Sequence, residues 1–210
     1  MEKVNKRKVF KVVGWLVAVG ISVMLLGLLN RCDDVNIKWQ EEVRMSEGKM
    51  LLVDRTAKGK LTGGYGMGGT AGWKEEEMSL EVRQLPAAWA PPPVWRKKYA
   101  PILLDYHPQE RTWRIVATHL ACKGWERLGR PDLPYVEYQS RNGGPWEIIP
   151  LEEQLIGRKA NLFPGMRSGV EPELVTLEET DKHYLSPEER YQRIISVWQP
   201  DNCLPNLEGK

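Results

Sequence analysis

Residues 37–45 read IKWQEEVRM, and residues 46–53 continue as SEGKMLLV. Every second residue of the first stretch is apolar, and Glu41 is the single charged misfit on that face. A period of two is typical of a strand that buries one side. Because a turn around Gly48 leads into an apolar run at 50–53, the pattern predicts a β-hairpin.

The same alternation returns further along the chain and predicts a mainly β or α+β domain. We expect one antiparallel sheet of six to eight strands with one or two short helices. Further strands are predicted at 78–83, 102–106, 112–118, 135–139 and 146–149, with a short helical turn in LEEQLI (151–156) that Gly157 ends. A helix is predicted over 187–199, because Ser186-Pro187-Glu188-Glu189 forms a capping box before an apolar stripe ending at Trp198.

The glycine-rich stretch GKLTGGYGMGGTAG (59–72) contains the spacing G-x-G-x-x-G at Gly64, Gly66 and Gly69. That spacing binds a pyrophosphate only where a helix opens at the last glycine. A strand pattern follows instead, so we expect a flexible hairpin loop and no nucleotide or other cofactor.

The segment AAWAPPPVW (87–95) cannot be a central strand, because proline lacks the N–H that a sheet requires. We expect an extended, polyproline-like connector packed by Trp89 and Trp95. The alternative is a ligand for an aromatic groove on another protein.

A membrane anchor is predicted at 12–30, where VVGWLVAVGISVMLLGLL precedes Asn30. These 18 uncharged residues would span about 27 Å as a helix, close to the hydrocarbon thickness of a bilayer. The core is longer than that of a cleavable signal peptide, and Arg31 stands where a lipoprotein signal requires a small residue before Cys32.

Charge predicts the orientation of that anchor. Residues 1–11 carry a net charge of +4, whereas the remainder of the chain carries −2. Positive flanks stay inside, so 1–11 should be a cytoplasmic tail and 31–210 an exported domain. A nearly neutral domain offers no charged face for nucleic acid.

The three cysteines are Cys32, Cys122 and Cys203, and none forms a C-x-x-C motif. In an oxidising compartment Cys122 and Cys203 could form a disulfide. The alternative is that Cys122 is a small buried apolar residue. The sequence favours neither the disulfide nor the buried cysteine over the other.

Signals for catalysis are sparse. His107, His119 and His183 lie far apart, so no metal site is predicted, and no nucleophile elbow occurs. A pair of Cys122 with His119 would need a bend in its strand, since positions i and i+3 face opposite sides.

The stretch GWERLGRPDLPYVEY (124–138) holds Arg127 and Arg130 beside Trp125 and Tyr135. An arginine fixed beside aromatic rings suits carboxylate or phosphate recognition. Arg127, Arg130 and Tyr135 are therefore the predicted ligand contacts. The alternative is that the arginines stack on rings and bond backbone carbonyls.

Two blocks, WQEEVRMSEGKMLLVDR (39–55) and GRPDLPYVEYQSRNGGPWEIIPLEE (129–153), resemble a group of uncharacterised bacterial proteins. These proteins share a W-x-E-E-V strand, GRP-x-x-PYV and a tryptophan before IPLEE. This chain departs from them in its longer glycine-rich loop and its APPP insertion. The resemblance implies a bacterial source and a β-rich domain. It implies no particular activity.

Together with the bacterial resemblance, these features predict a non-catalytic single-pass protein of the inner membrane, whose exported, periplasmic domain contacts another envelope component. The alternative is an anchored enzyme that acts on an envelope polymer through a carboxylate or arginine in 127–138.

Overall fold

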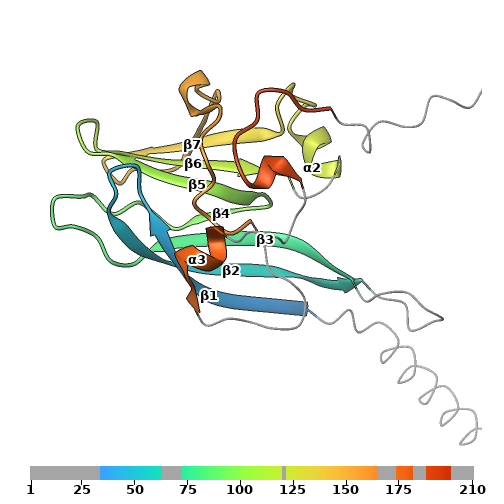
Figure 1. Ribbon diagram of the computed structural model, residues 1–210. Helices are drawn as coiled ribbons and strands as arrows, with labels where there is room; N and C mark the ends of the chain where they lie inside the picture. Colours follow the sequence, from blue (N-terminus) through green and yellow to red (C-terminus); the bar gives the residue numbers. More distant parts are fainter. Residues whose placement is uncertain (1–33, 63–71, 120–121, 165–173, 182–187, 200–210) are drawn as a thin grey trace, which may run out of the picture. The chain divides into compact units, whose positions relative to one another are not determined.

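The computed structural model describes residues 34–62, 72–119, 122–164, 174–181 and 188–199 (Figure 1). All of them fall in the second of the chain's two units, which begins at Asp34. Within these residues the chain is mainly β, with two sheets and a few short helices. The strands are β1 (Asp34–Arg44), β2 (Met50–Thr62), β3 (Gly72–Val82), β4 (Trp95–Lys97), β5 (Ala100–His107), β6 (Thr112–Thr118), β7 (Tyr135–Arg141), β8 (Glu147–Ile149) and β9 (Leu174–Val175). The helices are α2 (Cys122–Arg127), η1 (Glu153–Leu155), α3 (Leu177–Asp181) and η2 (Glu189–Tyr191).

The first sheet has the strand order β4-β3-β2-β1-β9. The β1–β2 hairpin predicted from the opening sequence is confirmed, with antiparallel pairs from Asp34↔Lys60 to Arg44↔Met50. Gly48 has a φ of +80° in the connecting turn, a conformation that glycine adopts without strain. The two-residue β9 runs parallel to β1, so the first sheet is not purely antiparallel.

The second sheet has the order β5-β6-β7-β8, with every neighbour antiparallel. The predicted strands at 102–106, 112–118 and 135–139 are its three longer members. Almost every residue of these three strands is buried, so both faces of the sheet are covered. Such a burial pattern requires a layer of protein on each side.

The two sheets pack face to face through aromatic side chains, β1 to β3 in one layer and β5 to β7 in the other (Figure 1). The ring centroids of Trp95 and Tyr138 lie 5.5 Å apart in an edge-on contact. Trp89 contacts Tyr106 at 4.3 Å and Trp113 at 5.6 Å. The predicted antiparallel sheet is therefore corrected to two sheets, because the apolar face of the first sheet is buried against the second.

The other face of the second sheet is covered by chain from 150–163 and 189–195. Leu155, Leu162 and Ile194 bury their side chains in the same core. Gly157 follows η1 with a φ of +84°, so the predicted helical turn and its stop are both confirmed.

The connector 87–95 packs as predicted from its tryptophans. Trp89 and Trp95 are buried, and two further indoles fix the backbone between them. Trp113 Nε1 donates to the Ala90 carbonyl at 2.7 Å, and Trp146 Nε1 donates to the Pro93 carbonyl at 2.8 Å. Two carbonyls and both tryptophans of the connector are thus held within the domain, whereas Pro91, Pro93 and Val94 are exposed, so the alternative of a ligand for an aromatic groove stays a prediction.

The glycine-rich stretch joins two long strands. β2 extends to Thr62 and β3 begins at Gly72, and these two residues pair in the hairpin. Residues 63–71 between them lie outside the described residues. A strand, and not a helix, follows the stretch, as the sequence predicted.

The predicted helix over 187–199 is wrong for the residues that the structure describes. Residues 189–191 form one 3₁₀ turn and Arg193 bridges Lys159 in antiparallel fashion. The Ile194 N–H donates to the Arg158 carbonyl at 3.0 Å, and the Ala160 N–H donates to the Gln192 carbonyl at 2.8 Å. Tertiary hydrogen bonds to 157–160 replace those of a helix, while Ser186 lies outside the described residues.

No helix in the described part of the chain is long and apolar enough to cross a bilayer. The predicted anchor at 12–30 and the basic tail at 1–11 both lie outside that part.

Candidate functional site

A buried ion pair explains the charged misfit noticed in the first strand. Glu41 and Arg55 face each other across the β1–β2 hairpin at 2.8 Å, with both side chains 0% exposed. Glu41 also accepts the Phe163 N–H, Arg55 donates to the Phe163 carbonyl, and Arg55 lies over the Trp39 ring. Burial raises the pKa of Glu41 despite the nearby Arg55 charge. The pair fixes the 160–163 segment to the first sheet and is inaccessible to any ligand.

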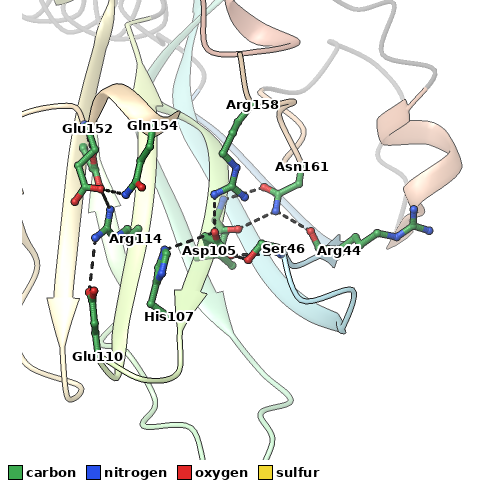
Figure 2. Close-up of polar contacts among 12 residues, drawn as sticks. Arg44, Ser46, Asp105, His107, Glu110, Arg114, Glu152, Gln154, Arg158 and Asn161 are labelled. Atoms are coloured by element: carbon green, nitrogen blue, oxygen red, sulfur yellow. Dashed lines mark hydrogen bonds and ion pairs between the residues drawn. The ribbon is translucent and has the colours of Figure 1, made fainter. Parts of the chain in front are cut away.

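A second polar cluster surrounds Asp105 at the edge of the second sheet (Figure 2). The buried Asp105 carboxylate accepts from the Ser46 hydroxyl at 2.7 Å and from Arg158 Nη1 at 2.6 Å. Burial would raise the pKa of Asp105, but these hydrogen bonds outweigh it and leave the pKa below its ordinary value of 3.8. Asp105 is therefore an anion held between the end of β1 and the segment after η1.

Asn161 closes the same edge (Figure 2). Its amide oxygen accepts the Leu104 N–H at 2.9 Å, and its Nδ2 donates to the carbonyls of Leu104 at 2.8 Å and Arg44 at 2.9 Å. One side chain thus satisfies the outward N–H and C=O of Leu104 and ties β5 to Arg44 at the end of β1. An edge strand that is covered in this way cannot pair with another chain.

Arg114 of β6 gathers three carboxylates on the same face of the sheet (Figure 2). It lies 3.7 Å from Glu110 and 3.5 Å from the buried Glu137, and it makes its closest contact with Glu152. The hydrogen bond from Arg114 lowers the pKa of Glu152, whereas burial raises the pKa of Glu137. Carboxyl pKa values pushed apart in this way are a feature of acid–base couples. Glu137, however, is 0% exposed, so a substrate cannot reach it.

The order of groups around Asp105 does not suit nucleophilic catalysis. His107 Nε2 lies 3.9 Å from Asp105 on the side opposite to Ser46. A hydrolytic triad places the imidazole between the hydroxyl and the carboxylate, so that the base can take the hydroxyl proton. Here the carboxylate stands in the middle and already accepts from the Ser46 hydroxyl.

In the described part of the chain, the outer face of the first sheet carries exposed polar side chains along β1. Residues Lys38, Thr56, Ser79 and Arg96 form one row across four neighbouring strands, by register. They line a hollow of about 450 Å³. Cations stand at the two ends of the row and hydroxyls between them. With strands about 4.8 Å apart, the end positions are separated by roughly 14 Å.

A second row of the hollow is a closed network of polar groups. Asp54 accepts from Gln40 Nε2 at 3.1 Å and from Arg83 Nε at 2.5 Å. Arg83 also contacts Glu81 at 3.1 Å. Arg83 is therefore balanced by two acids, so the excess positive charge of the hollow resides on Lys38 and Arg96.

The three predicted ligand contacts do not converge. Arg127 and Arg130 are exposed, and Arg130 lies over the Trp125 ring at 5.8 Å and beside Glu126 at 3.5 Å. Tyr135 is buried, where its hydroxyl bonds the carbonyl of Arg193 at 3.0 Å and the N–H of Ile195 at 3.1 Å. Tyr135 thus holds the C-terminal segment, and ligand binding at Arg127 and Arg130 stays a prediction.

Cys122 is disulfide-bonded, so it does not serve as a thiol nucleophile beside His119. Its expected partner Cys203 lies outside the described residues, so that pairing stays a prediction. Arg190 Nη1 donates to the His119 carbonyl at 2.9 Å, in a buried contact. No group of three metal-binding side chains occurs among the residues that the structure describes.

Sequence reasoning missed most of the polar clusters. Asp105 interrupts the apolar run 102–106, and Glu137 lies within the run 135–139. Each is a charged residue inside a predicted buried strand, the same signal that marked Glu41. Their partners Arg158 and Glu152 are distant in sequence, and only the fold brings them near.

No protein-family model, no curated protein and no solved structure matches this chain. The resemblance of its two blocks to bacterial proteins therefore stays a prediction.

Proposed function

We propose that the chain is a membrane-anchored binding protein without catalytic activity. Residues 12–30 would hold it in a bacterial inner membrane, and the domain from Asp34 would contact another envelope component from the periplasmic side. Its docking surface is the hollow on the outer face of the first sheet.

One observation carries the proposal: the two sheets differ in how their outer faces are covered. The second sheet is buried on both sides by the protein's own chain. The first sheet has an outer face with exposed polar residues along β1 and a hollow of about 450 Å³. An extended open sheet face is available for recognition, whereas the covered face is part of the core.

The buried ionisable groups support binding over the enzyme alternative. Glu41 bonds Arg55, Asp105 bonds Arg158, and Glu137 receives the N–H of Glu152. Glu41, Asp105 and Glu137 are thus each bonded within the domain, and all three side chains are buried. General acid–base catalysis requires a group within hydrogen-bond reach of substrate.

Charge indicates the chemistry of the partner. Lys38 and Arg96 are exposed at the two ends of the hydroxyl row, and neither makes an ion pair within the described part of the chain. A partner surface with carboxylates about 14 Å apart would match both cations. Such rim charges mainly govern the rate of association and its dependence on salt.

Site-specific photocrosslinking in intact membranes tests this proposal. A crosslinker at Thr56, in the hollow, should give one discrete adduct, whereas one at Gln109, in the exposed turn after β5, should give none. Reversing both cations with Lys38→Glu and Arg96→Glu should abolish the adduct. The same adduct from both positions, or an adduct unaffected by charge reversal, would contradict the proposal.

A further inference from the structure

The two edges of the second sheet differ in how they are covered. At the β5 edge, residues 161–162 hydrogen-bond the backbone groups of Ile102 and Leu104. β8 ends the sheet on the other side, and within the described part of the chain no residue bonds the outward backbone groups of 147–149. Alternate residues of an antiparallel edge strand direct N–H and C=O outward. A short row of donors and acceptors therefore stays available at β8.

β8 extends past the first sheet, which leaves one apolar side chain uncovered. The end of β1 meets β5 where Ser46 donates to Asp105, and β4 meets β7 where Trp95 contacts Tyr138. Because β4 is the last strand of the first sheet, no strand of that sheet lies over β8. Ile148 pairs with Tyr138 and faces the same side, but it is 64% exposed. The uncovered side chain and the open backbone groups thus belong to one strand.

Trp146 extends the apolar surface beside Ile148. It directly precedes β8 and, two residues from Ile148, faces the same side. Its half-buried indole donates to the Pro93 carbonyl at 2.8 Å, which fixes the ring in place. A fixed indole beside an exposed aliphatic side chain forms a small patch that an apolar side chain of a partner can cover.

The chain next to this patch is positively charged. Lys97 places its Nζ 5.6 Å from the centroid of the Tyr138 ring, and Tyr138 is the strand partner of Ile148. Lys97 and Lys98 are exposed, and neither forms an ion pair with a described residue. Glu147, the one acid of β8, faces the opposite side by alternation. A partner with carboxylates is therefore favoured over a second copy, which would bring the same lysines to the same face.

Proline limits the length of a strand that could be added. Pro145 and Pro150 flank the edge, and proline supplies no N–H to a sheet. Pairing is therefore confined to 146–149, which span about 13 Å at 3.3 Å per residue. A short extended segment fits this edge, whereas a long strand does not.

We propose that the β8 edge binds a short, extended, acidic segment of another protein by strand addition. The segment hydrogen-bonds the outward groups of 147–149, and one of its apolar side chains covers Ile148 and Trp146. Carboxylates on the same face of the segment pair with Lys97 and Lys98. This inference does not depend on the docking surface proposed above, because none of these residues lines the hollow.

The experiment is a fluorescence anisotropy titration of labelled hexapeptides with the detergent-solubilised full chain. The peptide Glu-Thr-Val-Thr-Glu-Thr carries valine between two glutamates on one face, and it should bind with one-site saturation. The same peptide with lysine in place of both glutamates should bind at least about tenfold more weakly, because like charges then meet. The acidic peptide with N-methyl groups on its two central residues should not bind, since its central donors are blocked.

Three outcomes would overturn the proposal. The first is no saturable binding of the acidic peptide. The second is equal binding of the acidic and the lysine peptide, which contradicts the charge argument. The third is undiminished binding of the N-methylated peptide, which contradicts strand addition.

Variants localise the binding to the edge. Ile148→Thr should weaken the acidic peptide about fivefold without lowering the melting temperature, because the residue is 64% exposed. Lys97→Gln together with Lys98→Gln should weaken it about tenfold and reduce its dependence on salt. Val197→Thr, at a position 71% exposed, and Lys60→Gln, at an exposed position of β2, are the matched controls and should leave the affinity unchanged. Binding that tolerates both Ile148→Thr and the double lysine variant would place the peptide elsewhere and overturn the proposal.

Sedimentation velocity of the solubilised chain distinguishes a partner segment from a second copy. The wild-type chain and Ile148→Thr should have the same oligomeric state. A dimer that Ile148→Thr dissociates, and that Val197→Thr leaves intact, would show that a second copy occupies the edge and would overturn the proposal.

Discussion

At the scale of single residues, charged side chains in buried positions determine how the layers are joined. Burying either Glu41 or Arg55 alone would destabilise the fold. The free-energy cost of desolvating a charge is offset only by a close partner of opposite charge. Their pairing at 2.8 Å, with both partners bonded to Phe163, satisfies that condition. The same logic applies to Asp105 with Arg158.

Replacing Arg55 by Met should destabilise the domain by about 3–5 kcal/mol, because Glu41 is left buried without its counter-ion. Urea denaturation of the full chain in detergent measures the change. The double variant Glu41→Leu with Arg55→Met should recover a large part of the loss, since a buried pair is often replaceable by apolar residues. A double variant no more stable than the single one would show that the ion pair itself is required.

Asp105 makes the stability of the domain depend on pH in a defined direction. Its pKa is lower in the folded state than its ordinary value of 3.8, so the ionised form stabilises the fold. That contribution is complete above about pH 4 and is lost as pH falls through the folded-state pKa. The loss of unfolding free energy in Asp105→Asn should therefore be largest near neutral pH and shrink below pH 4. A loss that stays constant over this range would contradict the ionic role of Asp105.

At the scale of elements, short irregular segments complete the two sheets. Asn161 caps the outer edge of β5, and residues 192–194 hydrogen-bond to 157–160. The sequence of 187–199 has a helical apolar stripe, but Tyr191 and Ile194 reach the core from a bridged backbone instead. Tertiary contacts override local propensity where a segment covers a sheet.

Removing the Asn161 side chain should both destabilise the domain and expose an edge. Asn161→Ala leaves the N–H and C=O of Leu104 without their partner, at a cost of about 1–3 kcal/mol. Asn36→Ala, at an exposed position of β1, is the matched control. Light scattering of the solubilised chain should show self-association for Asn161→Ala alone. Equal behaviour of the two variants would mean that Asn161 does not protect the edge.

Tyr135 links the C-terminal segment to the second sheet. Burial raises its pKa to about 12, so the hydroxyl stays protonated and can both donate and accept hydrogen bonds. Tyr135→Phe should cost about 1 kcal/mol and increase hydrogen exchange at Ile195, whose N–H it accepts at 3.1 Å. Exchange at β6 amides, inside the second sheet, is the internal reference. Unchanged exchange at Ile195 would contradict this role.

At the scale of the whole molecule, the predicted anchor at 12–30 would decide the compartment, and the compartment would decide which partner the domain can reach. Met24→Arg should weaken membrane insertion by about 2.5–3.5 kcal/mol, because a charge is placed at the centre of the predicted span. Fractionation of membranes without detergent measures this. A reporter fused after Lys210 that is active only in the cytosol would contradict the periplasmic orientation, and with it the envelope partner.

The sequence determined the strands that bury one face, because a period of two is a local property that needs no knowledge of partners. It marked Glu41 as an exception, and it predicted the hairpins and the packed connector around Trp89 and Trp95. Ligand contacts at Arg127, Arg130 and Tyr135 were inferred from arginines and aromatic residues that are neighbours in the sequence, and the structure leaves the two arginines exposed and buries Tyr135.

Only the tertiary structure decided that the strands form two sheets, and that Asp105 meets Arg158. These are contacts between segments far apart along the chain, whose closeness depends on how whole layers pack. A single sequence records which groups require a partner, because burying a charge or a hydroxyl is costly. It does not record which distant segment supplies that partner, because this depends on how the two sheets pack around their shared core.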